Sequence, residues 1–347
     1  MKTKLRKKYL AYRQTGNIII RLLVVVFTIV FLYDQLFFEK DVTSVFDVFS
    51  NIHTGFLSNT LLLIAIILIP VNLFLESIKW KYLISKLETI SIFSSIKGLL
   101  AGIAVSMIMP NRVGDYLGRV FILKKADRLQ AVLSTFLGSL AQLITTIIFG
   151  LIALVFFYTE YINVYSGLHF WLYLGFILMV IIVIFIMILG FLNFSVFSII
   201  IKKISGNYYK KIEKYAQVFS WYSQWELLYV LILSISRYVI FSLQFYLLLQ
   251  LFGVEGGYFE SMMLIAIIYI VMAIIPTIAL TEIGVRGSVS LYIFQQHFEA
   301  LGLWNSEIAI GVVSASSMLW LFNIVLPAII GTGFVFSLKF FRKNNGS

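Results

Sequence analysis

Cysteine is absent from this chain of 347 residues, and histidine occurs only three times. Without thiols the chain cannot form disulfides, thiolate metal sites or a cysteine nucleophile. The histidines, His53, His169 and His297, are far apart and show no metal-ligand spacing. The sequence also has no GxxxxGKS/T phosphate-binding loop, and no catalytic triad built on serine or histidine can be assigned from it. We therefore expect no metal, no cofactor and no ATP-driven step on this chain.

Charge is also scarce: 12% of the residues are charged, whereas 61% are hydrophobic and the mean hydropathy is +0.97. No soluble core needs so much apolar material, so the composition predicts a polytopic membrane protein without room for a large soluble domain. The net charge of +11 comes from basic residues that are spread along the chain as topology signals. We therefore do not expect nucleic-acid binding.

The first part of the chain alternates between basic and acidic flanks. Residues 1–21 contain seven Lys and Arg residues and no acid, which places the N-terminus in the cytoplasm. The apolar run 18–33 resembles a signal peptide but lacks a small-residue cleavage site, so we interpret it as a retained first span. A second span, 57–75, is expected to leave the membrane at Glu76, into the basic stretch with Lys79, Lys81, Lys86 and Lys97.

The next apolar run is too short to cross a membrane. Residues 98–109 extend for roughly 18 Å as a helix, against a hydrocarbon core of about 30 Å. A second basic cluster, Lys124, Lys125 and Arg128, follows. Both flanks therefore look cytoplasmic, which predicts a re-entrant hairpin over 98–123. Irregular backbone at that depth must line a protein cavity.

The second half repeats this order. Spans are predicted at 129–158, 170–192, 227–251 and 308–338, with 258–300 as a second re-entrant hairpin that enters from the opposite face. The fold is thus all-α, with about six full spans plus two re-entrant hairpins and both termini cytoplasmic. Eight spanning helices remain the alternative. Residues 202–226 are basic and aromatic and are expected to lie along the cytoplasmic headgroups, as a connecting loop or a lipid sensor.

Charged residues interrupt both predicted hairpins just after a proline. After Pro110, Arg112, Asp115 and Arg119 share one helical face, with Gly114 and Gly118 between them. After Pro276, Glu282 and Arg286 are spaced to pair along a helix, beside Gly284 and Gly287. These charges lie either in solvated loops or on a polar face within the bilayer, where a charge costs roughly 2.5–3.5 kcal/mol.

The two prolines are 166 positions apart, close to half of the chain. This spacing and the opposite orientations of the two halves predict an inverted-topology repeat within a single membrane domain, 1–347. One repeat covers about 15–160 and the other about 165–338. In such architectures the substrate site forms at the membrane midplane, between broken helices.

At these residues the chain resembles the flippase-like membrane domain of lysylphosphatidylglycerol synthases, the lysylphosphatidylglycerol synthase transmembrane region family. The resemblance rests on Pro110-x-Arg112-x-Gly114-Asp115, where the family commonly has P-x-R-x-G-E, and on the later segment with Pro276 and Arg286. It covers about residues 15–338. In this chain Asp115 replaces the usual glutamate, and Glu282 precedes its arginine, whereas family members often place the acid after it.

The resemblance implies translocation or related handling of a lipid, in a bacterial-type cytoplasmic (inner) membrane. The soluble aminoacyl-transfer domain of the full-length synthases has no counterpart in these residues, so we expect no lysyl transfer. The expected partner is a membrane lipid with an anionic headgroup. Arg112, Arg119 and Arg286 suit its phosphate, because guanidinium binds phosphate bidentately. Asp115 and Glu282 are expected to compensate these arginines when the site is empty.

Two other classes stay open. A polytopic glycosyltransferase that uses a polyprenyl-phosphate sugar needs acids in its first outer loop, and Glu39-Lys40-Asp41 has an acid-x-acid spacing. A scaffold or assembly factor that transports nothing is the other alternative. The sequence favours a transporter over an enzyme.

Overall fold

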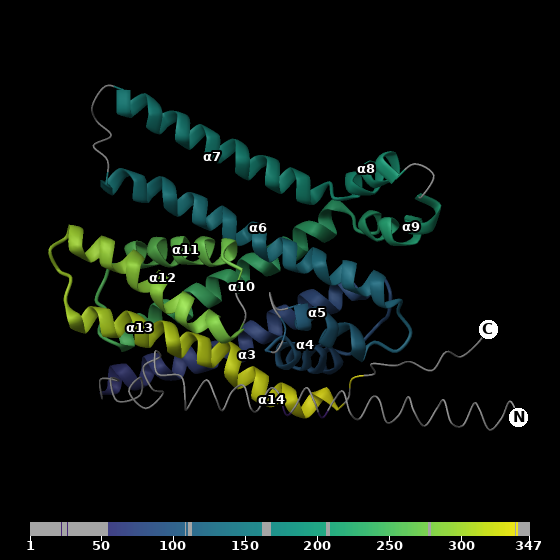
Figure 1. Cartoon of the computed structure of the whole chain (residues 1–347), viewed down its shortest axis with the longest axis horizontal. Helices are drawn as coiled ribbons and strands as arrows, with labels where there is room; N and C mark the ends of the chain where they lie inside the picture. Colours follow the sequence, from purple (N-terminus) through teal and green to yellow (C-terminus); the bar gives the residue numbers. More distant parts are fainter. Residues whose placement is uncertain are drawn as a thin grey trace, which may run out of the picture.

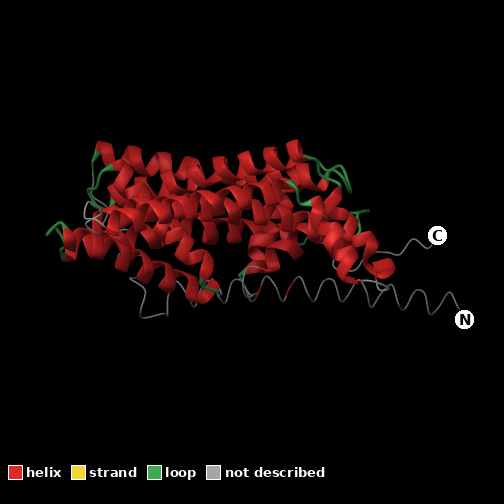
Figure 2. Cartoon of the chain, turned by 90° about the horizontal axis from the view of Figure 1, so that it is seen from above, coloured by secondary structure: helices red, strands yellow, loops and turns green. Residues whose placement is uncertain are grey.

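The protein is described from a computed structural model, which describes residues 22, 26, 55–107, 109, 113–161, 168–205, 209–276, 279–336 and 338. In these residues the chain consists of helices joined by loops, without strands (Figure 2). Five helical segments among them are long and apolar enough to cross a membrane. The chain is thus an integral membrane protein, and the expected all-α fold is confirmed. The predicted first span, 18–33, lies outside the described residues except at two isolated positions.

The helices follow one another in the predicted order. The five candidate spans are α3 (Phe56–Ile84), α6 (Arg128–Tyr161), α7 (Leu168–Leu192), α10 (Gln224–Leu251) and the segment α13–η4–α14 (Ser306–Trp320, Leu321–Val325, Leu326–Val335). The remaining helices are α4 (Ile92–Ser106), α5 (Val113–Ile122), α8 (Ser195–Ser205), α9 (Tyr209–Ala216), η3 (Gln217–Ser220), α11 (Tyr258–Ile274) and α12 (Ala279–Ala300).

Helix α3 differs from its prediction at its C-terminal end. It continues through Pro70 and past Glu76 to Ile84, and both Glu76 and Lys79 are buried. Its 29 residues extend for about 44 Å, which exceeds the hydrocarbon thickness of about 30 Å. Glu76 and Lys79, which the sequence analysis assigns to a charged flank of the span, thus lie on the buried face of this helix.

Long-range packing builds the centre of the bundle. Helix α3 packs along α10, α6 along α11, and α14 along α4. Helix α7 lies at the edge, beside α6 (Figure 1), and only 6% of the residues in its most apolar stretch are buried. Helix α7 therefore contributes little to the core of the bundle. The central helices carry the candidate functional residues.

Helices α4 and α5 form an antiparallel hairpin in which backbone packs on backbone. A Cβ added to Gly118 would lie 2.2 Å from Gly102 Cα, and one added to Gly114 would lie 2.5 Å from the Ser106 nitrogen. Small residues at such spacing let membrane helices approach closely. The 15 residues of α4 and 10 residues of α5 extend for only about 22 Å and 15 Å, as expected for a hairpin that does not cross.

The second hairpin, α11 and α12, is packed differently. Its helices have 17 and 22 residues, or about 25 Å and 33 Å. Pro276 lies in the break between them and is exposed. A Cβ added to Gly284 or Gly287 would meet no atom within 4 Å, so these glycines do not bring two backbones together.

The basic and aromatic segment 202–226 is largely helical in its described residues, rather than a plain loop. The Tyr222 hydroxyl donates to Leu83 O at 2.8 Å and lies 3.0 Å from Ser134 Oγ, which fixes the segment to α3 and α6. Lys214 Nζ also donates to Asp127 Oδ2 at 2.7 Å. Partial burial would raise the pKa of Asp127, but this hydrogen bond and two from backbone N–H groups lower it below its ordinary value.

We predict that Gly118→Ala separates α4 from α5 and lowers the free energy of unfolding by about 1–3 kcal/mol, because its methyl group has no room. Unfolding followed by tryptophan fluorescence in detergent measures the loss. Gly175→Ala in α7 is the matched control, since nothing lies within 4 Å of that position, and it should be neutral or slightly stabilising. Equal effects of the two changes would contradict the close contact.

We predict that single cysteines at Lys97 and Lys124 are labelled from the same side of the membrane, because α4 and α5 fold back on each other. The chain has no cysteine of its own, so a membrane-impermeant maleimide reports each position without background. Labelling from opposite sides would mean that the hairpin crosses the membrane.

Candidate functional site

The Glu76 carboxylate in α3 is the centre of a buried group of charges. Its side chain is 4% exposed and receives three cations. Arg119 Nη1 is 2.6 Å from Oε1, whereas Lys79 Nζ and Arg237 Nη1 are 2.8 Å and 2.9 Å from Oε2. Both carboxylate oxygens are thus held by charge-assisted hydrogen bonds from helices α3, α5 and α10.

Arg119 joins this group to the predicted motif residue Asp115. Its Nε donates to Asp115 Oδ1 at 2.9 Å and its Nη2 to Asp115 Oδ2 at 2.5 Å, a bidentate pair along α5. The Arg119 side chain is 5% exposed and that of Asp115 is 25% exposed. Arg119 therefore bridges two carboxylates, one of which is partly accessible.

We call Glu76, Lys79, Asp115, Arg119 and Arg237 the charge cluster. Its three cations and two carboxylates give a net charge of +1. Removing ions from water is costly, and only close pairing with further hydrogen bonds offsets that cost. The surplus positive charge makes the cluster a favourable neighbour for an anion.

Neutral side chains extend the cluster across the bundle. Arg237 Nε donates to Asn72 Oδ1 at 2.7 Å, and the Asn72 amide donates to Asn323 Oδ1 at 3.3 Å. Asn323 then donates to Gln244 Oε1 at 2.8 Å, and Gln244 donates to Ala65 O at 2.9 Å. A polar chain thus runs between α3, α10 and the π-helix η4.

Asn323 has a second local role in this chain. Its Nδ2 also donates to Leu319 O, one turn earlier, at 3.0 Å. A side chain that competes for a helix carbonyl disturbs the regular ladder, and Asn323 lies in the π-helical turn between α13 and α14. This turn therefore aims the amide toward α3 and α10.

The second predicted pair lies on α12. Arg286 Nη2 donates to Glu282 Oε1 at 2.8 Å, and both side chains are less than 10% exposed. A buried acid–arginine pair at helical spacing was expected from the sequence. It belongs to the other hairpin, so the two charged pairs are on different elements.

The ends of the two hairpins meet through apolar side chains. Met107 after α4 and Ile283 in α12 pack in one cluster with Trp320 of α13. Each hairpin therefore contributes a buried side chain to this cluster. Arg112 and Pro110 lie outside the described residues. Convergence of all five predicted charges on one cavity thus stays a prediction.

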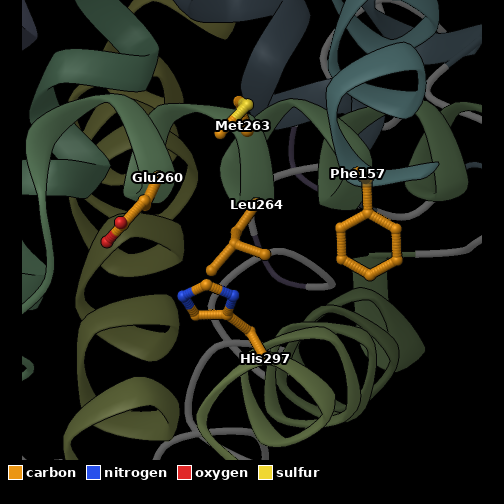
Figure 3. A pocket seen from close by; sticks show the side chains of 5 residues that line it. All are labelled: Phe157, Glu260, Met263, Leu264 and His297. Carbon is orange, nitrogen blue, oxygen red and sulfur yellow. The ribbon is translucent and has the colours of Figure 1, made fainter. Parts of the chain in front are cut away.

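A small pocket lies elsewhere, between α6, α11 and α12 (Figure 3). It is lined by Phe157, Glu260, Met263, Leu264 and His297. Glu260 also accepts the Gly257 N–H at 3.3 Å as part of the α11 cap. In the described part of the chain, no three His, Asp or Glu side chains gather as a metal site would require.

Six residues of the charge cluster and of its polar extension were not predicted from the sequence: Glu76, Lys79, Arg237, Asn72, Asn323 and Gln244. One signal was available for the α3 residues. Asn72, Glu76, Lys79 and Trp80 recur at helical spacing, so they share one face of a helix that continues past 75. Nothing local to Arg237 indicates its partner, which is 161 residues away.

Comparison with known proteins gives one family. The family model described as lysylphosphatidylglycerol synthase TM region matches residues 18–296. This match includes the charge cluster and the Glu282–Arg286 pair. No curated protein and no solved structure gives a significant match.

We predict that Glu76→Gln lowers the free energy of unfolding by about 3–5 kcal/mol, because three cations lose their shared charged partner. The double variant Glu76→Gln, Lys79→Gln should recover part of this loss, since it restores the cluster's net charge. Thermal unfolding in detergent measures both, with the exposed Glu255→Gln as the neutral control. Strictly additive losses would show that the cluster is not coupled.

Proposed function

Because this chain belongs to the lysylphosphatidylglycerol synthase TM region family, we propose that it translocates or handles an anionic lipid, a phospholipid or a lipid-linked phosphate. The headgroup passes through the interior of the bundle, along a midplane path lined by arginines and acids. The observation that carries this proposal is the charge cluster, a buried group with a net positive charge inside an otherwise apolar bundle.

A headgroup phosphate cannot enter hydrocarbon without compensation of its charge. In the proposed path Arg119 supplies that compensation, because its guanidinium is already held by two carboxylates and needs little reorganisation. Asp115 is the more exposed of these two partners. Exchange of Asp115 for a phosphate keeps Arg119 paired while the lipid is bound.

Arg112, Asp115, Arg119, Glu282 and Arg286 are proposed to line this path. Glu76 and Arg237 extend it on the α3 and α10 side. The apolar cluster that contains Met107, Ile283 and Trp320 supports a common path, because both hairpins contribute to it.

We further propose that the bundle is an inverted-topology repeat, with re-entrant hairpins α4–α5 and α11–α12. The contacts support this proposal. If the two halves are exchanged, α3 corresponds to α10, α6 to α13–α14, and α4 to α11. The packing of α6 on α11 then corresponds to the packing of α14 on α4, and the structure has both contacts.

Both of these corresponding contacts also use a glycine. A Cβ added to Gly150 of α6 would lie 2.6 Å from Ile270 Cβ of α11, and one added to Gly331 of α14 would lie 2.0 Å from Leu100 O of α4. In this arrangement the site forms between the two hairpins, and both termini are cytoplasmic.

We predict that liposomes containing the purified protein move a fluorescent anionic phospholipid between leaflets, as followed by dithionite quenching. Arg119→Lys should slow this movement about tenfold, because it keeps the charge but loses the bidentate fork. Lys81→Gln, which removes an exposed cation from α3, is the matched control and should leave the rate unchanged.

The glycosyltransferase alternative is tested in the same assay. Glu39 and Asp41 lie outside the described residues, and on the lipid-transport proposal they are dispensable. The double change Glu39→Gln, Asp41→Asn should therefore keep full lipid movement. No movement by the wild-type protein above empty liposomes would reject lipid transport.

A further inference from the structure

Buried polar atoms without a hydrogen-bond partner gather on α12 and α13. On α12 these atoms are Arg286 Nε, Arg286 Nη1 and Ser290 Oγ. On α13 they are Ser314 Oγ, Ser316 Oγ and Trp320 Nε1. Buried polar groups in proteins are nearly always paired, so such a concentration calls for a physical explanation.

These atoms lie at matching levels of two neighbouring helices. Helices α12 and α13 pack on each other and are joined by residues 301–305 (Figure 1), so they run antiparallel. Ile283 and Trp320 belong to one apolar cluster, so the N-terminal part of α12 lies near the C-terminal end of α13. With equal rise per residue on both helices, Arg286 and Gly287 lie level with Ser316, and Ser290 lies near the level of Ser314.

The orphan atoms also share helix faces. Arg286 and Ser290 are four residues apart on α12, and Ser316 and Trp320 are four residues apart on α13, so each pair lies on one face. Trp320 is 2% exposed and Ser290 is 0% exposed. Both faces are therefore buried inside the protein rather than turned to lipid.

The chemistry of the group is that of a donor set. Arginine and the tryptophan indole only donate hydrogen bonds, and serine can do so. Arg286 is 7% exposed, yet Glu282 occupies only its Nη2. Arg119, in contrast, uses Nε, Nη1 and Nη2 on Glu76 and Asp115. In the described part of the chain, most buried donors without a partner thus lie on α12 and α13, although others, such as Ser77 Oγ on α3, lie elsewhere.

The backbone beside these donors is not crowded. Gly287 is buried, but a Cβ added to it would meet no atom within 4 Å. Elsewhere in the bundle, buried Gly118 and Gly331 have backbone atoms within 2.2 Å of an added Cβ. Space for an acceptor group therefore adjoins Arg286.

We propose that Arg286, Ser290, Ser316 and Trp320 form a subsite between α12 and α13 that binds the oxygens of a phosphate group. This proposal rests on the proposed function and deepens it, because it separates two roles. The charge cluster holds α3, α5 and α10 together and compensates the headgroup charge at Arg119 during passage, and the α12–α13 subsite supplies the unpaired donors that hold the ligand.

Trp320→Phe and Ser290→Ala test the subsite, because each removes one orphan polar group, and Ser290→Ala does so with little loss of volume. Binding of phosphatidylglycerol to the purified chain is measured by native mass spectrometry, and each variant should weaken it about fivefold to tenfold. Thermal unfolding of the lipid-free Ser290→Ala variant should be unchanged or slightly improved, because it loses an unsatisfied buried group. Trp320→Phe should unfold at a lower temperature, because it leaves a cavity in a buried apolar cluster. Trp304→Phe and the exposed Ser288→Ala are the matched controls and should bind as the wild type does.

Inorganic phosphate and glycerol 3-phosphate are tested as competitors. If either compound competes with phosphatidylglycerol for the wild-type protein but not for the two variants, the subsite recognises a soluble phosphate. If neither compound competes and phospholipid binding still depends on Trp320 and Ser290, the source of the phosphate is the lipid headgroup. Unchanged phospholipid affinity in both variants overturns the subsite. If Ser290→Ala also lowers the stability of the lipid-free protein, the donors are satisfied by water rather than by a ligand.

These outcomes are distinguishable from failure of the proposed function. If wild-type liposomes move no lipid but phosphatidylglycerol binding still depends on Trp320 and Ser290, the subsite stands and transport is rejected. If lipid moves normally and both variants bind and transport as the wild type does, transport stands and the subsite is rejected.

Discussion

The interaction on which the rest of the bundle depends is the three-way pairing of the Glu76 carboxylate. Its two oxygens receive Lys79 from the same helix, Arg119 from α5 and Arg237 from α10, all within 2.9 Å. A carboxylate buried to this degree is tolerated only because cations surround it, and each cation is tolerated because of the carboxylate. The first hairpin is therefore fixed to the central pair α3 and α10 by charge, whereas the backbone contact at Gly118 holds α5 against α4 within the hairpin.

The two hairpins are built on different principles. The α4–α5 hairpin is closed by glycines, and its arginine has all three nitrogens engaged. The α12 side of the second hairpin has open space at Gly287 and an arginine with two unpaired nitrogens. The first hairpin thus has its arginine fully paired within the protein, whereas the second has donors left over for a ligand.

The sequence predicts much of the fold and part of the site. Apolar runs and their charged flanks place four of the spanning helices to within three residues at each end, whereas α3 continues nine residues past its predicted end. Helical spacing foresees both the Asp115–Arg119 and the Glu282–Arg286 pairs. The role of Glu76 was missed because a charge at the end of an apolar run has the appearance of a membrane boundary. The partner of Arg237 and the orphan donors around Trp320 arise only when distant helices pack, so no local pattern indicates them.

The central claim is that an anionic headgroup enters the interior of the bundle. A phospholipid with a photoactivatable headgroup tests it most directly, when it is cross-linked to the reconstituted protein and mapped by mass spectrometry. The account predicts labelled peptides from α12 and α13, with labelling competed by unmodified phosphatidylglycerol. Labelling confined to peripheral α7, whose apolar residues face outward, would contradict it.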